Sequence, residues 1–194
     1  MPTKTHTTES ANTPLASCVA DPDRDYACAI VDSAWSSPEA RAQHMLPLAQ
    51  AQRGTAGTDR AAWEARVLEG TIRRVLPLAL HAAARVHPDA LIRAMLLAAA
   101  DRCASDGTRE AAGFAAYATY ANATDAAKDT DAYTVYAAYA AVANAVSAAY
   151  AAKTAKAVAY AVYAVYAVVG DDSDLLLTTA VSVALNAYAA EGRQ

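Results

Sequence analysis

Hydrophobic positions recur three or four residues apart through most of the chain, with polar residues between them. This spacing is the period of an α-helix with one apolar face. Glycine, proline and capping residues interrupt the pattern and separate the predicted elements. The pattern predicts helices over residues 22–34, 36–52, 59–69, 71–85, 88–104 and 108–128, then one or two more up to 169 and a last one over 171–192.

The predicted fold is all-α: a single compact bundle of about six to eight helices. Residues 1–20 are rich in threonine, serine, asparagine and proline and have no helical period. Such a composition predicts a disordered N-terminal tail. We therefore expect that tail to precede one all-helical domain over residues 21–194.

Capping residues locate several of the expected helix ends. Residues 36–39, Ser-Ser-Pro-Glu, combine a cap, a proline for the first turn and the glutamate of a capping box. Pro47 should bend that helix or end it early. Thr58 is predicted to cap the next helix and Gly70 to stop it. Pro77 should kink the helix that follows.

Three more signals mark later helix ends. His87-Pro88 predicts a break between two helices. The run Ser105-Asp106-Gly107 is predicted to end the second of these, and Thr108 to cap the helix after it.

Two segments supply the conventional core candidates. Trp63 and Val67 are one turn apart and are expected to point inward. Residues 88–104 carry the richest set of large apolar side chains, which predicts the best core face of the chain. These side chains are Leu91, Ile92, Met95, Leu96 and Leu97.

Residues 111–169 are built almost entirely from alanine and tyrosine and hold nine of the eleven tyrosines. Alanine has the best helix propensity, so the stretch is predicted to be helical. On a helical wheel of residues 133–152 the tyrosines fall within an arc of about 120°, and alanines occupy the opposite side. A strip of alanines lets another helix approach closely, which predicts tight alanine-mediated packing.

The tyrosine side of this stretch has two interpretations. The rings can complete the core and its edge while their hydroxyls reach solvent, or they can form a partner surface, because tyrosine is enriched in protein contacts. We favour the first interpretation and keep the second as the candidate site. The candidate partner residues are Tyr133, Tyr136, Tyr139, Tyr150, Tyr160, Tyr163 and Tyr166.

Composition and charge argue against several functional classes. The net charge is −4, and no strongly basic face is visible, so nucleic acid is not an expected partner. Residues 132–152 contain no charged residue, but they include Thr134, Asn144 and Ser147 and lack leucine, isoleucine and phenylalanine. A membrane span is therefore not expected there, although the segment is long enough for one.

Cysteine usage indicates a reducing compartment. Cys18, Cys28 and Cys103 form no CxxC pair, and the odd number gives no disulfide framework. The first 15 residues are polar and have no apolar segment of a signal peptide. We therefore expect a cytoplasmic protein.

No pattern of catalytic or metal-binding residues stands out. His6, His44, His81 and His87 form neither HxxxH nor HExxH, and no phosphate-binding loop or GxSxG motif occurs. Arg102 beside Cys103 could activate the thiol, but a small buried residue is the favoured interpretation. We therefore predict no enzyme activity, no catalytic residue, no cofactor and no metal site.

Residues 45 to about 160 resemble a family of alanine-rich helical immunity proteins of bacteria and phages. The shared features are Leu46-Pro47-Leu48, Thr58-Asp59-Arg60, the run Ala62-Trp63-Glu64-Ala65-Arg66 that closes at Gly70, and an alanine–histidine run with His81. Members have no established catalytic residues. The resemblance implies a protein that binds and neutralises a partner protein.

The leading hypothesis is therefore a non-catalytic helical protein-binding module. It would be toxin-neutralising, like an immunity protein, or an accessory protein encoded by a phage. The alternative is a structural protein that self-associates through its alanine faces. Membrane association ranks third.

Overall fold

The computed structural model describes residues 35–52, 59–126 and 173–191. Every regular element in these ranges is helical, which confirms the all-α prediction for them. The predicted count of six to eight helices is not confirmed by this part of the chain. The expected tail at 1–20, the expected helix at 22–34 and most of the alanine–tyrosine stretch lie outside the described residues.

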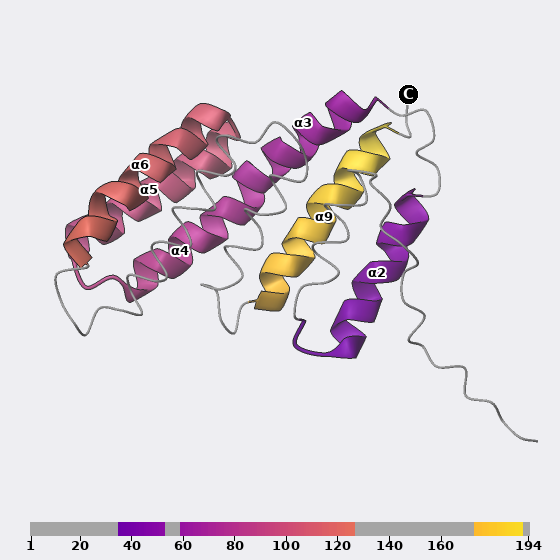
Figure 1. The fold of residues 1–194 in the computed structure, drawn as a ribbon, viewed down its shortest axis with the longest axis horizontal. Helices are drawn as coiled ribbons and strands as arrows, with labels where there is room; N and C mark the ends of the chain where they lie inside the picture. Colours follow the sequence, from indigo (N-terminus) through magenta and orange to yellow (C-terminus); the bar gives the residue numbers. More distant parts are fainter. Residues whose placement is uncertain (1–34, 53–58, 127–172, 192–194) are drawn as a thin grey trace, which may run out of the picture.

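A continuous helical rod runs through the middle of the molecule (Figure 1). It consists of α3 (Arg60–Gly70), the π-helical turn η1 (Thr71–Val75) and α4 (Leu76–Val86). The turn η1 packs against helices on both sides of the rod, so it lies at the centre of the described fold.

The remaining described helices pack in two pairs along the rod (Figure 1). At one end, α5 (Ala90–Asp106) lies along α4, and α6 (Arg109–Ala126) lies beside α5. At the other end, α9 (Ser173–Glu191) lies between α3 and α2 (Pro38–Gln52).

Gly70 does not stop the helix, which corrects the sequence prediction. Its backbone angles, φ −61° and ψ −36°, are helical, and the chain continues directly into η1. A Cβ atom at this position would lie only 2.7 Å from Cγ1 of Val183 on α9. The glycine therefore allows α3 and α9 to approach closely, and the helical rod continues through it.

Pro77 is accommodated by the π turn that precedes it. Proline has no N–H for the carbonyl of Arg73, and its ring would clash with that carbonyl in a regular α-helix. The N–H of Leu76 bonds instead to the carbonyl of Thr71, five residues back. The wider π turn therefore replaces the regular α-helical spacing immediately before Pro77.

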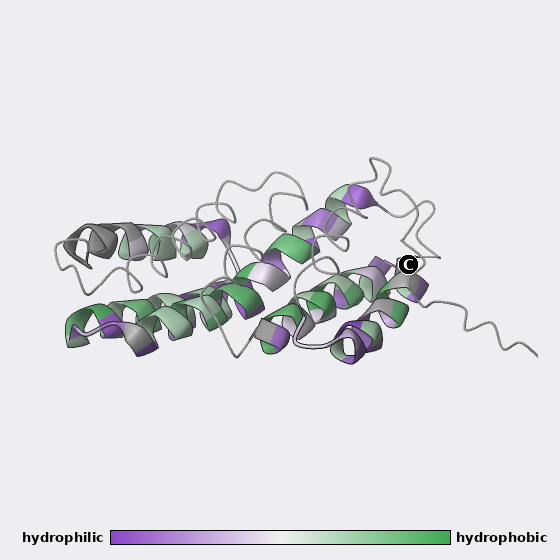
Figure 2. Ribbon diagram, turned by 60° about the horizontal axis from the view of Figure 1, so that its bottom comes forward, coloured by the Kyte–Doolittle hydropathy of each residue, from purple (hydrophilic) through white to green (hydrophobic). Residues whose placement is uncertain are grey.

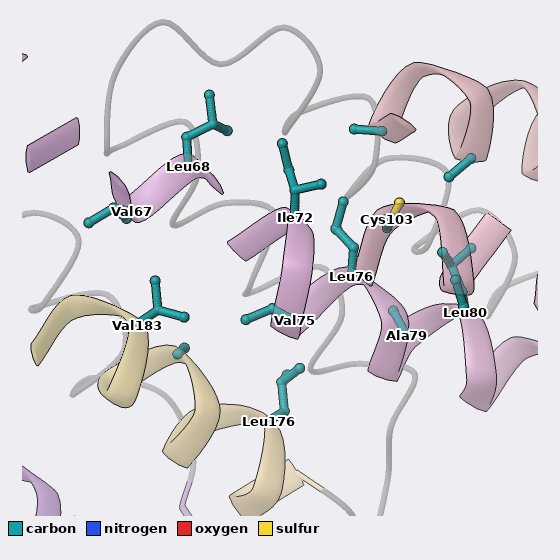
Figure 3. Close-up of a cluster of buried hydrophobic side chains, with 14 of the residues drawn as sticks. Val67, Leu68, Ile72, Val75, Leu76, Ala79, Leu80, Cys103, Leu176 and Val183 are labelled. Atoms are coloured by element: carbon teal, nitrogen blue, oxygen red, sulfur yellow. The ribbon is translucent and has the colours of Figure 1, made fainter. Parts of the chain in front are cut away.

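Several of the largest buried side chains line the contact between the rod and α9. Trp63 and Val67 are 1% and 0% exposed, which confirms their predicted inward orientation. Figure 3 shows Val75 of η1 facing Leu176 and Val183 of α9. The Trp63 ring also lies against Tyr188, with 5.2 Å between the ring centroids.

The predicted core face of α5 is only partly correct. Leu96 is fully buried, whereas Leu91 and Leu97 are 71% and 41% exposed. At about 100° per residue, Leu91 and Leu97 each point well away from Leu96. The buried side of α5 is completed by small residues, Ala99, Ala100 and Cys103. These small residues allow close approach of the neighbouring helices.

Polar caps hold the helix starts. Asp59, rather than the predicted Thr58, caps α3 by accepting from the N–H groups of Ala61 and Ala62. Ser37 caps α2, with its hydroxyl 3.1 Å from the N of Ala40. Because Ser37 is the cap, a capping box would need its glutamate at position 40, so Glu39 does not form the predicted capping box. Pro47 lies inside α2, which continues to Gln52.

Asp89 caps α5 through the N–H groups of Leu91 and Ile92. The bonds from Ile92 and Leu91, together with the nearby charge of Arg93, hold the pKa of the Asp89 carboxyl below its ordinary value. The predicted break at His87-Pro88 is confirmed, because α4 ends at Val86.

Arg73 closes the C-terminal end of α5 from the side. Its guanidinium donates to the carbonyls of Ala104, Ser105 and Asp106, with N–O distances of 3.2 Å to Ala104 and 2.9 Å to Asp106. Gly107 ends the helix in the left-handed conformation, with φ of 64°. A cation at this end also interacts favourably with the helix dipole.

Candidate interaction surface

The described part of the alanine–tyrosine stretch is α6. Thr108 caps this helix as predicted: its hydroxyl accepts from the N–H of Ala111 at 3.2 Å, and its carbonyl accepts from Ala112. Side-chain positions are described up to Thr119.

One side of α6 is a buried strip of alanines. Ala111, Ala112, Ala115 and Ala118 are all 0–1% exposed. Thr119 continues the strip, and its hydroxyl bonds back to the carbonyl of Ala115 at 3.0 Å. Because α6 packs against α5 and touches η1, these methyl groups form its packing side. The predicted close packing by alanine is therefore observed in this helix.

The two described aromatic side chains of α6 face the other way. Tyr117 is 72% exposed and Phe114 is 42% exposed. They lie three residues apart and so share one side of the helix. Among the described side chains of this helix, alanines are inside and the two aromatic residues are outside, which reverses the usual distribution of size in a core.

Arg102 of α5 extends the aromatic side of α6. Its guanidinium carbon lies 4.9 Å from the centroid of the Phe114 ring, within cation–π range. Leu91, Met95 and Ala98 precede Arg102 at helical spacing and lie on the same side of α5. We refer to these positions together as the α5–α6 surface: Leu91, Met95, Ala98, Arg102, Phe114 and Tyr117.

The tyrosines predicted as the partner surface lie outside the described residues. They are Tyr133, Tyr136, Tyr139, Tyr150, Tyr160, Tyr163 and Tyr166. Phe114, Tyr117 and Arg102 are not among the residues that the sequence pattern predicted as a partner surface. The signal that could have found the first two is their three-residue spacing within the same alanine–aromatic pattern.

The described histidines occupy separate structural positions. His87 is buried, and its Nδ1 accepts from the N–H of Asp89 at 3.0 Å. His44 stacks on Trp35 at a centroid distance of 5.1 Å, and His81 is exposed on α4. In the described ranges no group of three or more histidine, cysteine, aspartate or glutamate side chains is placed to hold a metal ion.

Cys103 is a core residue. It is completely buried, and burial raises the pKa of its thiol to about 11. Arg102 lowers this pKa and Asp106 raises it, but both effects are smaller than that of burial. The thiol is therefore protonated and inaccessible, as the favoured interpretation of the sequence predicted.

Within the described residues, no helix combines the length and hydrophobicity that a bilayer crossing requires. The uncharged segment at 132–152 lies outside these residues, so its predicted lack of a membrane span stays a prediction.

Comparison of the chain with protein families, with curated proteins and with solved structures finds no match in any of the three, so the resemblance to immunity proteins stays a prediction.

Proposed function

We propose that this protein is a non-catalytic helical module that binds another protein through the aromatic side of its alanine–tyrosine stretch. The observation that carries the proposal is the exposure of Tyr117, at 72%, above a fully buried alanine strip. A ring placed outside in a helix that packs by its alanines is available for recognition.

The chemistry of the α5–α6 surface suits a protein partner. Tyrosine and arginine are the residues most enriched where binding energy is concentrated. Phe114 and Tyr117 lie beside Arg102, which already contacts the Phe114 ring. Rings on a helix lose little freedom on binding, because only two side-chain torsions must be fixed.

The same arrangement extends by sequence to the later tyrosines. Residues 133–166 repeat the three-residue spacing of tyrosine opposite alanine. We include Tyr133, Tyr136, Tyr139, Tyr150, Tyr160, Tyr163 and Tyr166 in the proposed surface on this ground. The resemblance to immunity proteins favours a toxin as the partner and a bacterial or phage origin.

Stability measurements test whether the aromatic residues hold the fold. If they serve recognition, Tyr117→Ser changes the free energy of unfolding by less than about 0.5 kcal/mol, as expected for an exposed position. Ala115→Leu overpacks the buried strip and should cost about 1–3 kcal/mol. A larger loss for Tyr117→Ser than for Ala115→Leu would show that the ring is structural.

Site-specific photo-crosslinking in the native host tests the binding role. Benzoylphenylalanine replaces Tyr117, and a matched control replaces Asn186, which is exposed on α9. We expect one protein crosslinked from position 117 and not from 186. Purified, that protein should bind the wild-type chain and bind Tyr117→Ser at least about tenfold more weakly.

The outcomes separate the competing functions. A captured toxin that the wild-type chain neutralises supports the immunity-like role. A crosslink between two copies, with sedimentation that depends on concentration, would identify self-association instead. Equal products from positions 117 and 186 would refute the α5–α6 surface as a binding site.

A further inference from the structure

Helix α2 is joined to the rest of the described fold through one neighbour. It packs extensively against α9, and no other described helix or turn gives it comparable contact. The rod helices, in contrast, are held from several sides. Within the described fold, helix α2 therefore depends mainly on α9 for its attachment.

Among its described side chains, few apolar ones anchor α2 to the rest of the fold. Among the α2 side chains that the structure describes, Leu48 is the one that is fully buried, and Ala51 is half-buried. Figure 2 shows α2, at the right of the molecule, as a mixture of hydrophilic and hydrophobic positions. Pro47 also removes one backbone hydrogen bond from its interior.

A polar clasp at the start of α2 provides the remaining attachment. The backbone N–H of Ser36 donates to Oδ1 of Asp174 at 3.0 Å, and the Ser36 hydroxyl donates to Oδ2. These two bonds, with a smaller effect of His44, hold the pKa of the Asp174 carboxyl below its ordinary value. The clasp is exposed to water, so each bond competes with solvent.

Two further contacts complete the clasp. His44 of α2 lies with Nε2 3.1 Å from the hydroxyl of Thr178 on α9. The Trp35 ring stacks on His44, and its buried indole nitrogen has no hydrogen-bond partner among the described residues. A buried polar atom without a hydrogen-bond partner costs free energy, so this contact is less stable than one made by apolar side chains alone.

From these contacts we infer that α2 is a releasable strap over α9, which undocks as a unit while the rod, α5 and α6 stay folded. Asp174, Thr178, Val181 and Leu185 share one side of α9 at helical spacing. Undocking therefore uncovers Val181 and Leu185, and the strap controls exposure of this side of α9. This inference does not depend on the binding role proposed for the α5–α6 surface.

Amide hydrogen exchange of the full chain, read helix by helix, tests the strap. We expect α2 amides to exchange at least about 100-fold faster than those of α4 and α5, because they open without global unfolding. Asp174→Asn, which weakens the clasp, should speed exchange in α2 by about a further tenfold and leave α4 unchanged. Asp101→Asn on the exposed side of α5 is the matched control and should alter neither helix.

Two results would overturn the inference. Equal exchange in α2 and α4 would mean that α2 opens only when the whole domain unfolds. An effect of Asp174→Asn that is absent, or that spreads equally over all helices, would mean that the clasp does not hold α2 separately. Thr178→Val provides a second variant that removes the His44 contact while keeping the shape of the side chain.

Discussion

Gly107 and Arg73 form a steric pair whose strength can be measured. A methyl group at position 107 meets two costs. The first is the left-handed backbone, since φ is 64° and a residue with a Cβ pays about 1–2 kcal/mol there. The second is displacement of Arg73, because the added Cβ would lie 2.6 Å from its Cγ.

The displacement of Arg73 breaks its bonds to the three carbonyls at the end of α5. Arg73 is 37% exposed, so solvent replaces part of this interaction and about 1 kcal/mol is lost. Gly107→Ala should therefore destabilise the protein by about 2–3 kcal/mol. With a urea dependence of about 2 kcal/mol per molar, the unfolding midpoint falls by about 1–1.5 M.

A double-mutant cycle isolates the second cost. Urea unfolding is followed by far-ultraviolet circular dichroism for the wild type, Gly107→Ala, Arg73→Ala and the double variant. In the Arg73→Ala background Gly107→Ala should cost only the backbone strain, so the coupling energy is about 1 kcal/mol. If Gly107→Ala costs the same free energy in the wild type and in Arg73→Ala, the role of Arg73 is refuted. If its cost is negligible in both, the argument from the left-handed backbone is refuted as well.

Three further outcomes are expected. Gly70→Ala should cost about 1–3 kcal/mol because its Cβ meets Val183, and Val183→Ala should recover most of that loss in thermal or urea unfolding. With the other two cysteines replaced by serine, Cys103 should resist a thiol reagent at pH 8 in the native state and react after unfolding, since burial raises its pKa to about 11. The Asp89 carboxyl has a lowered pKa, so it contributes stability above the pKa of the unfolded chain, and that contribution is lost as pH falls through the folded value. The difference in unfolding free energy between wild type and Asp89→Asn should therefore shrink between pH 6 and pH 2.5; a constant difference would contradict this assignment.

Helix boundaries were predictable where local chemistry decides them. The break at His87-Pro88, the stop at Gly107 and the cap at Thr108 agree with the structure. These signals act through bonds between residues close in sequence. Local propensity therefore carried enough information for this part of the fold.

Tertiary contacts decided the positions where the predictions were wrong. Glycine is typical of a helix end, but at position 70 the absence of a side chain makes room for Val183, which is far away in sequence. Leucine is typical of a hydrophobic core, but Leu91 and Leu97 are exposed. The side of α5 that packs against its neighbours carries Ala99 and Cys103 instead. A single sequence does not reveal which face of a helix a distant segment will cover.

The candidate site shows the same limit. The wheel separated alanines from tyrosines, and the division is seen in α6 with Ala115 inside and Tyr117 outside. Periodicity shows that the helix has an alanine side and a tyrosine side. It does not show which side faces the core, because both alanine and tyrosine are compatible with burial. Tyr117 is 72% exposed, so the aromatic side of α6 is its outer side, while both interpretations of the later tyrosines stay predictions.

The position of α9 has a consequence for the order of folding during synthesis. Among the described helices α9 emerges from the ribosome last, yet it packs against α3, η1 and α2, which emerge early. The hairpin-like neighbours α4, α5 and α6 make mostly local contacts, which form quickly. We expect these three helices to fold first. The apolar side of α3, including Trp63 and Val67, then stays uncovered until α9 has been synthesised. That interval is when the nascent chain is most exposed to aggregation and to chaperone binding.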